Sequence, residues 1–333
     1  MNIEINLKEL KEFKRIFKSD FIQVTAMGNK VELYSRDCKI EFLKVVLDAK
    51  IYEDGTVMLP TYLIDVLPPG NITITEKGLN NENTLIDFKE FDKKATYETF
   101  AIDDILVKDI KGEILKEMLE VKHAIAKDEC RPVLENICLR GNDAVSLDGY
   151  RLSKRTTNFN LDRDIFISKD VVKIINKIKV NGNGFIGVQE ENIIFKIDEY
   201  FIRFKNVSGE FIEYNGLIPK ENKIICNVDS KIMLKVLQRA KRLGEYLVNV
   251  NIKNKSMDLT INRFDITFNE RINVECNGEI NLGLNINYLI DTFKVLKGNV
   301  SMELNSKVTP VICKQNGKLE LILPIRLSKQ GDE

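Results

Sequence analysis

The sequence repeats itself, and this repetition restricts the possible folds more than any other feature. The run Tyr-Leu-Ile-Asp occurs at 62–65 and again at 288–291, each time within a short amphipathic stretch. A third amphipathic stretch, residues 169–175, lies about halfway between the two copies. Chains built from equal segments fold into similar units that pack against their neighbours. The spacing therefore predicts a threefold internal repeat.

A second amphipathic helix recurs with the same spacing. Residues 7–18 carry apolar side chains at helical intervals, and the segments 110–127 and 229–244 do the same. Between the helices, apolar and polar residues alternate with the period of half-buried strands, as in 257–262. The sequence thus predicts an α+β fold of three similar domains, each with two helices packed on antiparallel sheet. The expected domains are residues 1–104, 105–221 and 222–333.

Composition indicates an ordinary soluble protein of the cytoplasm. The chain begins with no signal peptide and contains no apolar run long enough to span a membrane. Its six cysteines show no CxxC pairing, so reduced and mostly buried thiols are favoured over disulfides or a metal site. The 50 basic residues balance the 50 acidic ones, and net charge alone therefore indicates no nucleic-acid partner.

The basic residues are unevenly distributed. Residues 7–18 hold five basic and two acidic side chains, and the segments 169–179 and 229–243 are also strongly basic. Lysine and arginine often do no more than solvate an exposed helix face. Here, however, the excess recurs on the helices while the strands and loops carry the opposite charge. This distribution favours helices that contact phosphates.

The sequence contains no convincing catalytic constellation. His123 is the only histidine, and its surroundings indicate a helix-surface residue rather than a general base. Residues 182–187 match GxGxxG, but a helix precedes them and a strand follows, which is the reverse of a dinucleotide site. Asp103 and Asp104 have no partners at metal-ligand spacing. We therefore expect no enzyme activity, no metal and no cofactor.

Short motifs in the second and third repeats resemble one known family. The second repeat contains Arg131-Pro132-Val133-Leu134 and then Asp148-Gly149-Tyr150-Arg151-Leu152. The third contains Gly283-Leu284-Asn285 followed by Tyr288, and the chain closes with Leu323-Pro324-Ile325-Arg326-Leu327. In order and spacing these motifs resemble the bacterial sliding clamp, the beta subunit of DNA polymerase III. The resemblance is specific over residues 105–327.

Some positions depart from the family pattern. Ser19-Asp20-Phe21-Ile22 stands where an Arg-Pro-rich segment is usual, Ile212 replaces a common proline, and Gly216 replaces a common basic residue. Residues 328–333 extend beyond the usual end of the chain. These departures are compatible with a diverged or accessory clamp.

The resemblance implies a DNA clamp fold in which two three-domain chains form a ring. Such a homodimer encircles double-stranded DNA without reading its sequence. It acts in DNA replication as a processivity factor, binding the DNA polymerase III alpha subunit, the clamp loader and repair proteins through short linear motifs. The main alternative is a three-domain protein-binding scaffold that does not encircle DNA. A metal-dependent DNA-processing enzyme is a distant third possibility.

Three sets of site residues follow from the motifs and the basic helices. The resemblance places a partner peptide-binding pocket at Leu134, Gly149, Tyr150, Arg151, Leu152, Ile212, Leu217, Asn285, Tyr288, Val308, Leu323, Pro324, Ile325 and Arg326. The expected DNA contacts are Lys8, Lys11, Lys14, Arg15, Lys173, Lys177, Lys235, Arg239 and Arg242. The expected dimer interface includes Phe100, Ile102 and Ile272.

Overall fold

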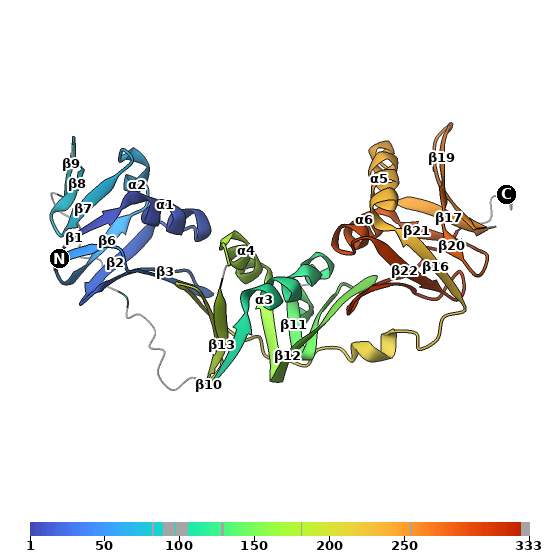
Figure 1. Ribbon diagram of the computed structural model, residues 1–333, viewed down its shortest axis with the longest axis horizontal. Coiled ribbons are helices and arrows are strands. Elements are labelled where there is room, and N and C mark those ends of the chain that lie inside the picture. Colours follow the sequence, from blue (N-terminus) through green and yellow to red (C-terminus); the bar gives the residue numbers. More distant parts are fainter. Residues whose placement is uncertain are drawn as a thin grey trace. The chain divides into compact units, whose positions relative to one another are not determined.

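The computed structural model describes residues 1–81, 83–88, 97, 106–127, 130–180, 182–253 and 255–327. The chain divides into two compact units (Figure 1). The first unit comprises Met1–Lys116 and Asp170–Asn206, and the second comprises Glu117–Lys169 and Val207–Glu333. Within the described residues both units are α+β, with antiparallel strands and short helices. No described helix is long and apolar enough to cross a membrane.

The first unit contains two antiparallel sheets. Its elements are β1 (Asn2–Asn6), α1 (Leu7–Ile16), β2 (Phe21–Met27), β3 (Lys30–Arg36), β4 (Ile40–Val46), β5 (Lys50–Glu53), β6 (Gly55–Pro60), α2 (Leu63–Val66), β7 (Asn71–Thr75), β8 (Gly78–Asn81), β9 (Thr84–Asp87), β10 (Leu106–Lys111), α4 (Lys169–Lys177), β13 (Asn183–Gln189), β14 (Asn192–Ile197) and β15 (Tyr200–Lys205). A five-stranded sheet has the order β5-β1-β7-β8-β9. An eight-stranded sheet has the order β10-β13-β14-β15-β4-β3-β2-β6.

The second unit also contains two sheets. The helix α3 (Gly112–Met118) leads into it from β10. Its elements are η1 (Leu119–Ala124), η2 (Pro132–Glu135), β11 (Asn136–Leu147), β12 (Arg151–Ser168), η3 (Tyr214–Leu217), β16 (Ile224–Asp229), α5 (Ser230–Ala240), η4 (Lys241–Leu243), β17 (Leu247–Lys253), β18 (Ser256–Arg263), β19 (Ile266–Asn273), β20 (Glu275–Cys276), β21 (Ile280–Asn285), α6 (Ile286–Val295), β22 (Asn299–Leu304), β23 (Val311–Gln315) and β24 (Lys318–Ile322). The sheet orders are β11-β12-β24-β23-β22-β16-β20 and β19-β18-β17-β21.

Neighbouring repeats share sheets. In the first unit, β4 of the first repeat pairs with β15 of the second, from Ile40 opposite Phe204 to Lys44 opposite Tyr200. In the second unit, β12 of the second repeat pairs with β24 of the third, starting with Arg151 opposite Ile322. The predicted middle domain therefore contributes strands to both compact units. The boundaries at 104 and 221 stay a prediction about the repeat, because the compact units divide the chain elsewhere.

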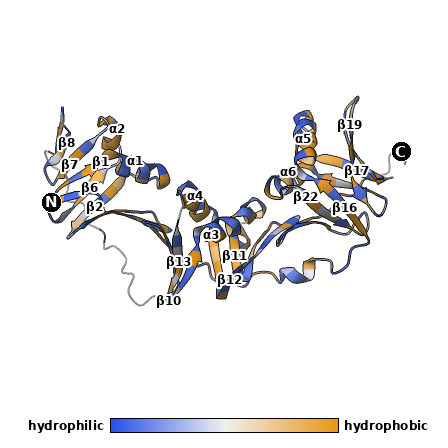
Figure 2. Ribbon diagram, in the orientation of Figure 1, coloured by the Kyte–Doolittle hydropathy of each residue, from blue (hydrophilic) through white to orange (hydrophobic). Residues whose placement is uncertain are grey.

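Amphipathic sequence and capping explain the longer helices. The side chain of Asn6 accepts a hydrogen bond from the Lys8 amide and begins α1, and Asp229 and Asn285 begin α5 and α6 in the same way. Leu10 and Phe13 of α1 are fully buried. Hydrophobic and hydrophilic residues alternate along the helices and strands of both units, as this arrangement requires (Figure 2). The core of the third repeat forms between α5, α6 and the strands around them.

The helix expected over 110–127 is shorter than the periodicity indicates. The α-helical part ends at Met118, and residues 119–124 continue as a 3-10 helix. This tighter turn allows Val121 and Ala124 to stay buried while Glu120 and His123 reach polar partners. The GxGxxG run forms no phosphate loop, since residues 183–189 are strand β13.

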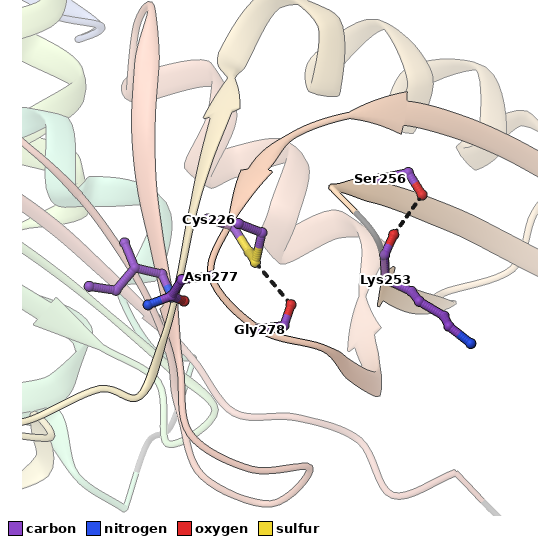
Figure 3. Close-up of a disulfide and its surroundings, with 7 residues drawn as sticks. Cys226, Lys253, Ser256, Asn277 and Gly278 are labelled. Atoms are coloured by element: carbon purple, nitrogen blue, oxygen red, sulfur yellow. Dashed lines mark hydrogen bonds between the residues drawn. A yellow bond between two sulfur atoms is a disulfide. The ribbon is translucent and has the colours of Figure 1, made fainter.

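The expectation that all cysteines are reduced is wrong for one pair. Cys226 on β16 and Cys276 on β20 lie opposite each other in an antiparallel ladder and form a disulfide (Figure 3). Beside it, Asn277 accepts a hydrogen bond from the amide of Ile225 at 2.7 Å. The pair is 50 residues apart in sequence, so no short spacing could reveal it. Cys38, Cys138 and Cys313 are free thiols.

Candidate functional site

The turn before β12 is the centre of the predicted peptide site, and it lies wholly in the second unit. The Asp148 carboxylate accepts hydrogen bonds from the amides of Tyr150 and Arg151, both at 3.1 Å. Gly149 has a φ of 87°, a conformation that glycine adopts without strain. The turn leaves the Tyr150 side chain 64% exposed. It therefore presents an aromatic ring on a rigid backbone.

Arg151 connects this turn to the third repeat. Its Nε donates to Asp148 at 2.9 Å and its Nη1 donates to Asp291 at 2.8 Å. The guanidinium also lies 4.4 Å from the centre of the Tyr288 ring, where a cation is attracted to the aromatic face. Tyr288 and Asp291 belong to the Tyr-Leu-Ile-Asp run that reveals the repeat. In the third repeat, that run supplies two partners of one arginine.

The surroundings of Tyr288 affect its hydroxyl. Burial, followed by the negative charge of Asp148, raises the pKa of Tyr288, and the Arg151 charge opposes this effect. The phenol therefore stays protonated and remains able to donate a hydrogen bond. Asn285, one turn earlier, uses its side chain to cap α6 at the Asn287 amide. If Asn285 also binds a peptide, as predicted, its side chain must do so while it caps α6.

The segment after β24 completes the site. The Leu323 amide donates to the Tyr150 carbonyl at 2.9 Å, and the Ile325 amide donates to the Gly283 carbonyl at 2.8 Å. A side chain at Gly283 would meet the Ile325 oxygen at 2.8 Å, so a glycine is needed there. Leu323 and Arg326 are exposed, whereas Pro324 and Ile325 are half-buried. This short stretch thus lies beside Tyr150, as the motifs predict.

The apolar members of the predicted site occupy two layers. Leu134 and Leu152 are fully buried in one core cluster, and Ile212 packs against that cluster from outside. Leu217 and Val308 are exposed apolar side chains. Leu134 and Leu152 are therefore core residues, and Leu217 and Val308 are exposed apolar members of the predicted set. A hollow of about 430 Å³ in the first unit is lined by Arg36, Lys39 and other charged residues, which suits an apolar motif poorly.

His123 is not the helix-surface residue that the sequence predicts. Its side chain is only 14% exposed, and its Nε2 lies 2.9 Å from Glu320. Its backbone carbonyl accepts a hydrogen bond from Nη2 of Arg151. Sequence reasoning missed this contact because His123, Arg151 and Glu320 belong to different elements and are far apart in the chain. A lone histidine carries no signal of its partners.

The basic residues of the first unit differ in what they contact. Lys8 and Lys11 are exposed on α1 and have no acidic partner among the described residues. Lys14 bonds to Asp65 at 2.5 Å. Arg15 donates to the Lys177 carbonyl at 3.3 Å, and Lys177 donates to the Ile16 carbonyl at 3.1 Å. The carboxyl ends of α1 and α4 are therefore joined by two basic side chains.

Lys173 and the basic residues of α5 and η4 also differ in what they contact. Lys173 pairs with Asp170 at 2.8 Å, and Arg239 pairs with Glu270 on β19. Lys235 and Arg242 are exposed, and within the described part of the chain neither has an acidic partner. The unpaired side chains are the better candidates for phosphate contacts, because paired ones must first give up a carboxylate.

None of the three predicted dimer-interface residues is seen as an exposed side chain. Phe100 and Ile102 lie outside the described residues. Ile272 is only 7% exposed and packs in the core of the third repeat, so its side chain offers little surface to a partner. It lies on β19, an outer strand of its sheet among the described residues. Pattern reasoning selected an apolar residue of that strand, but one that faces inward.

Known proteins are similar to this chain in sequence and in fold. The family model for the DNA polymerase III beta subunit, C-terminal domain, matches residues 215–326. The beta sliding clamp of Chlamydia pneumoniae is 23% identical over 310 residues, which is 85% of each chain. Over most of its length the chain is therefore similar to beta sliding clamps. The beta sliding clamp of a Synechocystis strain is 22% identical over 329 residues, 84% of each chain.

Solved clamps have the same fold. The DNA polymerase sliding clamp of Bacillus subtilis superimposes with a TM-score of 0.88 at 19% identity, covering 98% of this chain and 100% of that one. A clamp from Bartonella birtlesii bound to griselimycin gives a TM-score of 0.88, also at 19% identity and with the same coverage. The predicted DNA clamp fold is therefore confirmed.

Proposed function

We propose that this clamp is a processivity factor of DNA replication, a ring that encircles duplex DNA and tethers a polymerase to it. The observation that carries this proposal is the site around Arg151, where Asp148, Tyr288 and Asp291 from two repeats hold one guanidinium beside exposed apolar side chains. A clamp needs no catalytic group, since it acts by retention. Its proposed location is the cytoplasm.

The Arg151 site is the proposed docking point for partners. Tyr150, Leu217, Val308 and Leu323 supply exposed apolar surface, and Arg151 supplies fixed polarity. An apolar surface with a few oriented polar groups suits a short linear motif with a glutamine and bulky apolar residues. The partners would be the DNA polymerase III alpha subunit, the clamp loader and repair proteins.

The shared sheets suggest how two copies close the ring. β15 and β24, the last strands of the second and third repeats, pair with β4 and β12 of the preceding repeats. β9 is the last described strand of the first repeat, and β19 is the counterpart of β4 in the third. Both are outer strands of their sheets among the described residues. We therefore propose that β19 of one copy pairs with β9 of another, giving a head-to-tail homodimer.

Turn geometry supports this correspondence. Asp37 before β4 accepts hydrogen bonds from the amides of Lys39 and Ile40 at 2.7 and 2.8 Å, as Asp148 does before β12. The turn before β19 carries Phe264, which is 93% exposed at a φ of 48°. A positive φ is uncommon for a bulky residue. If β19 pairs with a second copy, that copy would cover the exposed ring of Phe264.

Retention on DNA tests the ring. The clamp, placed on DNA by its loader, should stay on closed circular duplex and slide off the same duplex after linearisation. A protein-binding scaffold would not distinguish the two forms, and equal retention would refute encirclement. A strictly monomeric mass at micromolar concentration would also exclude the ring.

Peptide titration tests the docking site separately. Truncation of an exposed apolar residue, as in Leu323→Ala, should weaken binding of a Gln-Leu-type peptide by about 1–2 kcal/mol. Tyr246→Ala is a matched control, because Tyr246 is an exposed aromatic residue of the same unit outside the site. Equal affinity for the wild type and the Leu323 variant would refute the assignment.

A further inference from the structure

The first compact unit has a hollow at the position that corresponds to the candidate peptide site of the second. The hollow, of about 430 Å³, lies where the turn before β4 meets the end of β15. In both units an aspartate closes the turn, and the strand after the turn pairs with the last strand of the next repeat. Ile40 lies opposite Phe204 in the first unit, as Arg151 lies opposite Ile322 in the second. The two places are therefore equivalent in the repeat.

The side chains at the equivalent positions differ in chemistry. Lys39 corresponds to Tyr150, because each is the last turn residue before the outgoing strand. Lys205 corresponds to Leu323, because each follows the residue that pairs with the start of that strand. An aromatic and an aliphatic side chain of one site are thus replaced by two lysines in the other. The ligand of the hollow should therefore carry negative charge.

Basic side chains outnumber acidic ones around the hollow. Its charged lining residues are Arg36, Asp37, Lys39, Glu41, Arg203 and Lys205. The Asp37 carboxylate accepts hydrogen bonds from two backbone amides of its own turn, at 2.7 and 2.8 Å, and Glu41 lies 3.5 Å from Arg203. Lys205 pairs with Glu191 at 2.7 Å, and both side chains are exposed, so a ligand can compete for this lysine.

Arg36 and Lys39 are the cations most available to a ligand. Both are exposed, and neither has an acidic partner among the described residues. The Arg36 guanidinium lies 4.1 Å from the centre of the Tyr97 ring, which orients the cation without neutralising its charge. Gln23 fixes Tyr97 in turn, since its side chain donates to the Tyr97 carbonyl at 2.9 Å and accepts from the Tyr97 amide at 2.6 Å. Arg36 is therefore both oriented and charged.

A second hollow adjoins the first and extends the site. It has a volume of about 480 Å³, shares Arg36 and Asp37 with the first hollow, and reaches Lys18 and Asp20. The carboxylates around both hollows can accept further hydrogen bonds. A peptide supplies backbone N–H donors for these carboxylates and acidic side chains for the cations. A DNA backbone supplies acceptors alone, which the carboxylates would repel. The mixed lining therefore favours an acidic peptide over a nucleic acid.

We propose that these two hollows form a second docking site, which binds a short acidic peptide segment of a partner protein through Arg36 and Lys39. A carboxylate of the segment would pair with the Arg36 guanidinium, whose parallel N–H groups match its two oxygens. The lysines would add attraction that salt screens. The site goes beyond the docking function proposed for Arg151, and it lies in the other compact unit.

The first test is calorimetric titration of a six-residue peptide of alternating serine and glutamate into the full chain. This peptide should bind, and the same peptide with glutamine in place of glutamate should not. Arg36→Gln and Lys39→Gln should each weaken binding by about tenfold, as expected for the loss of a hydrogen bond between charged groups. Lys77→Gln is a matched control, because it removes an exposed lysine of the same unit that does not line the hollows. Absence of binding, or equal affinity for the wild type and both hollow variants, would overturn the proposal.

The second test locates the bound peptide. Cys38 is an exposed free thiol in the lining of the first hollow. Its alkylation by iodoacetamide, followed by mass spectrometry of the fragment that contains it, should slow as the acidic peptide is added. Leu323→Ala changes the Arg151 site and should leave this protection intact. Loss of protection in Leu323→Ala would place the peptide at the Arg151 site instead. Protection by single-stranded oligothymidylate but not by the peptide would assign the hollows to nucleic acid, and either result would refute the proposal.

Discussion

Lys177 is a basic residue whose surroundings oppose its own charge. Burial, followed by the charges of Lys18, Arg15 and Lys173, holds the pKa of Lys177 below its usual range. The folded chain therefore disfavours the protonated form of the Lys177 side chain. A nearby anion would stabilise this protonated form. The lowered pKa therefore reduces the stability of the free protein, and a DNA phosphate beside Lys177 would offset this loss.

Replacement of Lys177 should consequently have opposite effects on stability and on DNA retention. Lys177→Met should raise the free energy of unfolding at neutral pH, by less than about 1 kcal/mol because the group is partly solvated. It should also reduce retention on circular DNA. The pKa is lower in the folded than in the unfolded chain, so wild-type stability rises with pH as Lys177 loses its proton. Thermal melts across the alkaline range should show this rise in the wild type and less of it in the variant.

The sequence predicts which residues form the candidate peptide site but not which contacts they make. Tyr150, Arg151 and Tyr288 are recognisable from short motifs, since each motif is local. The bonds from Arg151 to Asp291 and to the His123 carbonyl join residues that are far apart in sequence. No local pattern encodes such pairs, and pairwise contacts of this kind appear only in the folded chain.

Among the elements, β19 has the clearest expected role in assembly. Phe264 at its first turn and Ile266 at its start are exposed, while Ile272 near its end is buried. If β19 pairs with a second copy, Phe264→Ala should raise the dimer dissociation constant by about tenfold or more, as for other aromatic anchors. Sedimentation over a concentration series measures this. Phe264→Tyr, which keeps the ring, should stay dimeric, and an unchanged constant for Phe264→Ala would exclude this edge.

The disulfide between β16 and β20 should stabilise the third repeat. It closes a loop of 50 residues, and loss of so long a cross-link costs about 4 kcal/mol in the chain-entropy account. The double variant Cys226→Ser, Cys276→Ser should unfold at lower denaturant concentration than the oxidised wild type. Reducing agent should lower the wild type toward the variant and leave the variant unchanged. Equal midpoints throughout would mean that the bridge adds no stability.

Each repeat has an ion pair between a strand and a helix, and no sequence pattern predicts these pairs. Lys44 on β4 bonds to Glu9 and Glu12 of α1, and Arg155 on β12 bonds to Glu120 of η1. On β19 the signs are reversed, because Glu270 pairs with Arg239 of α5. Hydrophobic periodicity predicts the helices and strands. It cannot predict an ion pair in which the basic residue lies on the strand in two repeats and on the helix in the third.

At the scale of the whole molecule, weak phosphate contacts should add up to a salt-dependent hold on DNA. Each phosphate contact contributes about 0.9 to the slope of log retention against log salt. Lys235→Gln with Arg242→Gln should therefore lower the slope by about 1.8 if both side chains touch phosphates. Arg239→Gln is the control, and it should change the slope less because Glu270 already neutralises Arg239. An unchanged slope for the double variant would exclude phosphate contacts by Lys235 of α5 and Arg242 of η4.

The repeat and the α+β class are predictable because periodicity and turn chemistry act over short distances. The sharing of sheets between repeats is not, since strand partners such as β4 and β15 lie far apart in the chain. Composition likewise hid the Cys226–Cys276 bridge, whose members meet only because β20 returns to β16.

The sharing of sheets also determines how the gene can be divided. A fragment ending at residue 104 would leave β4 without β15, and one beginning at 222 would leave β24 without β12. Each fragment would expose unpaired backbone amide and carbonyl groups along one strand, and such an edge promotes aggregation. A single predicted repeat should therefore express poorly on its own, and chimaeras joined inside the repeats should fold more readily than chimaeras joined at their borders.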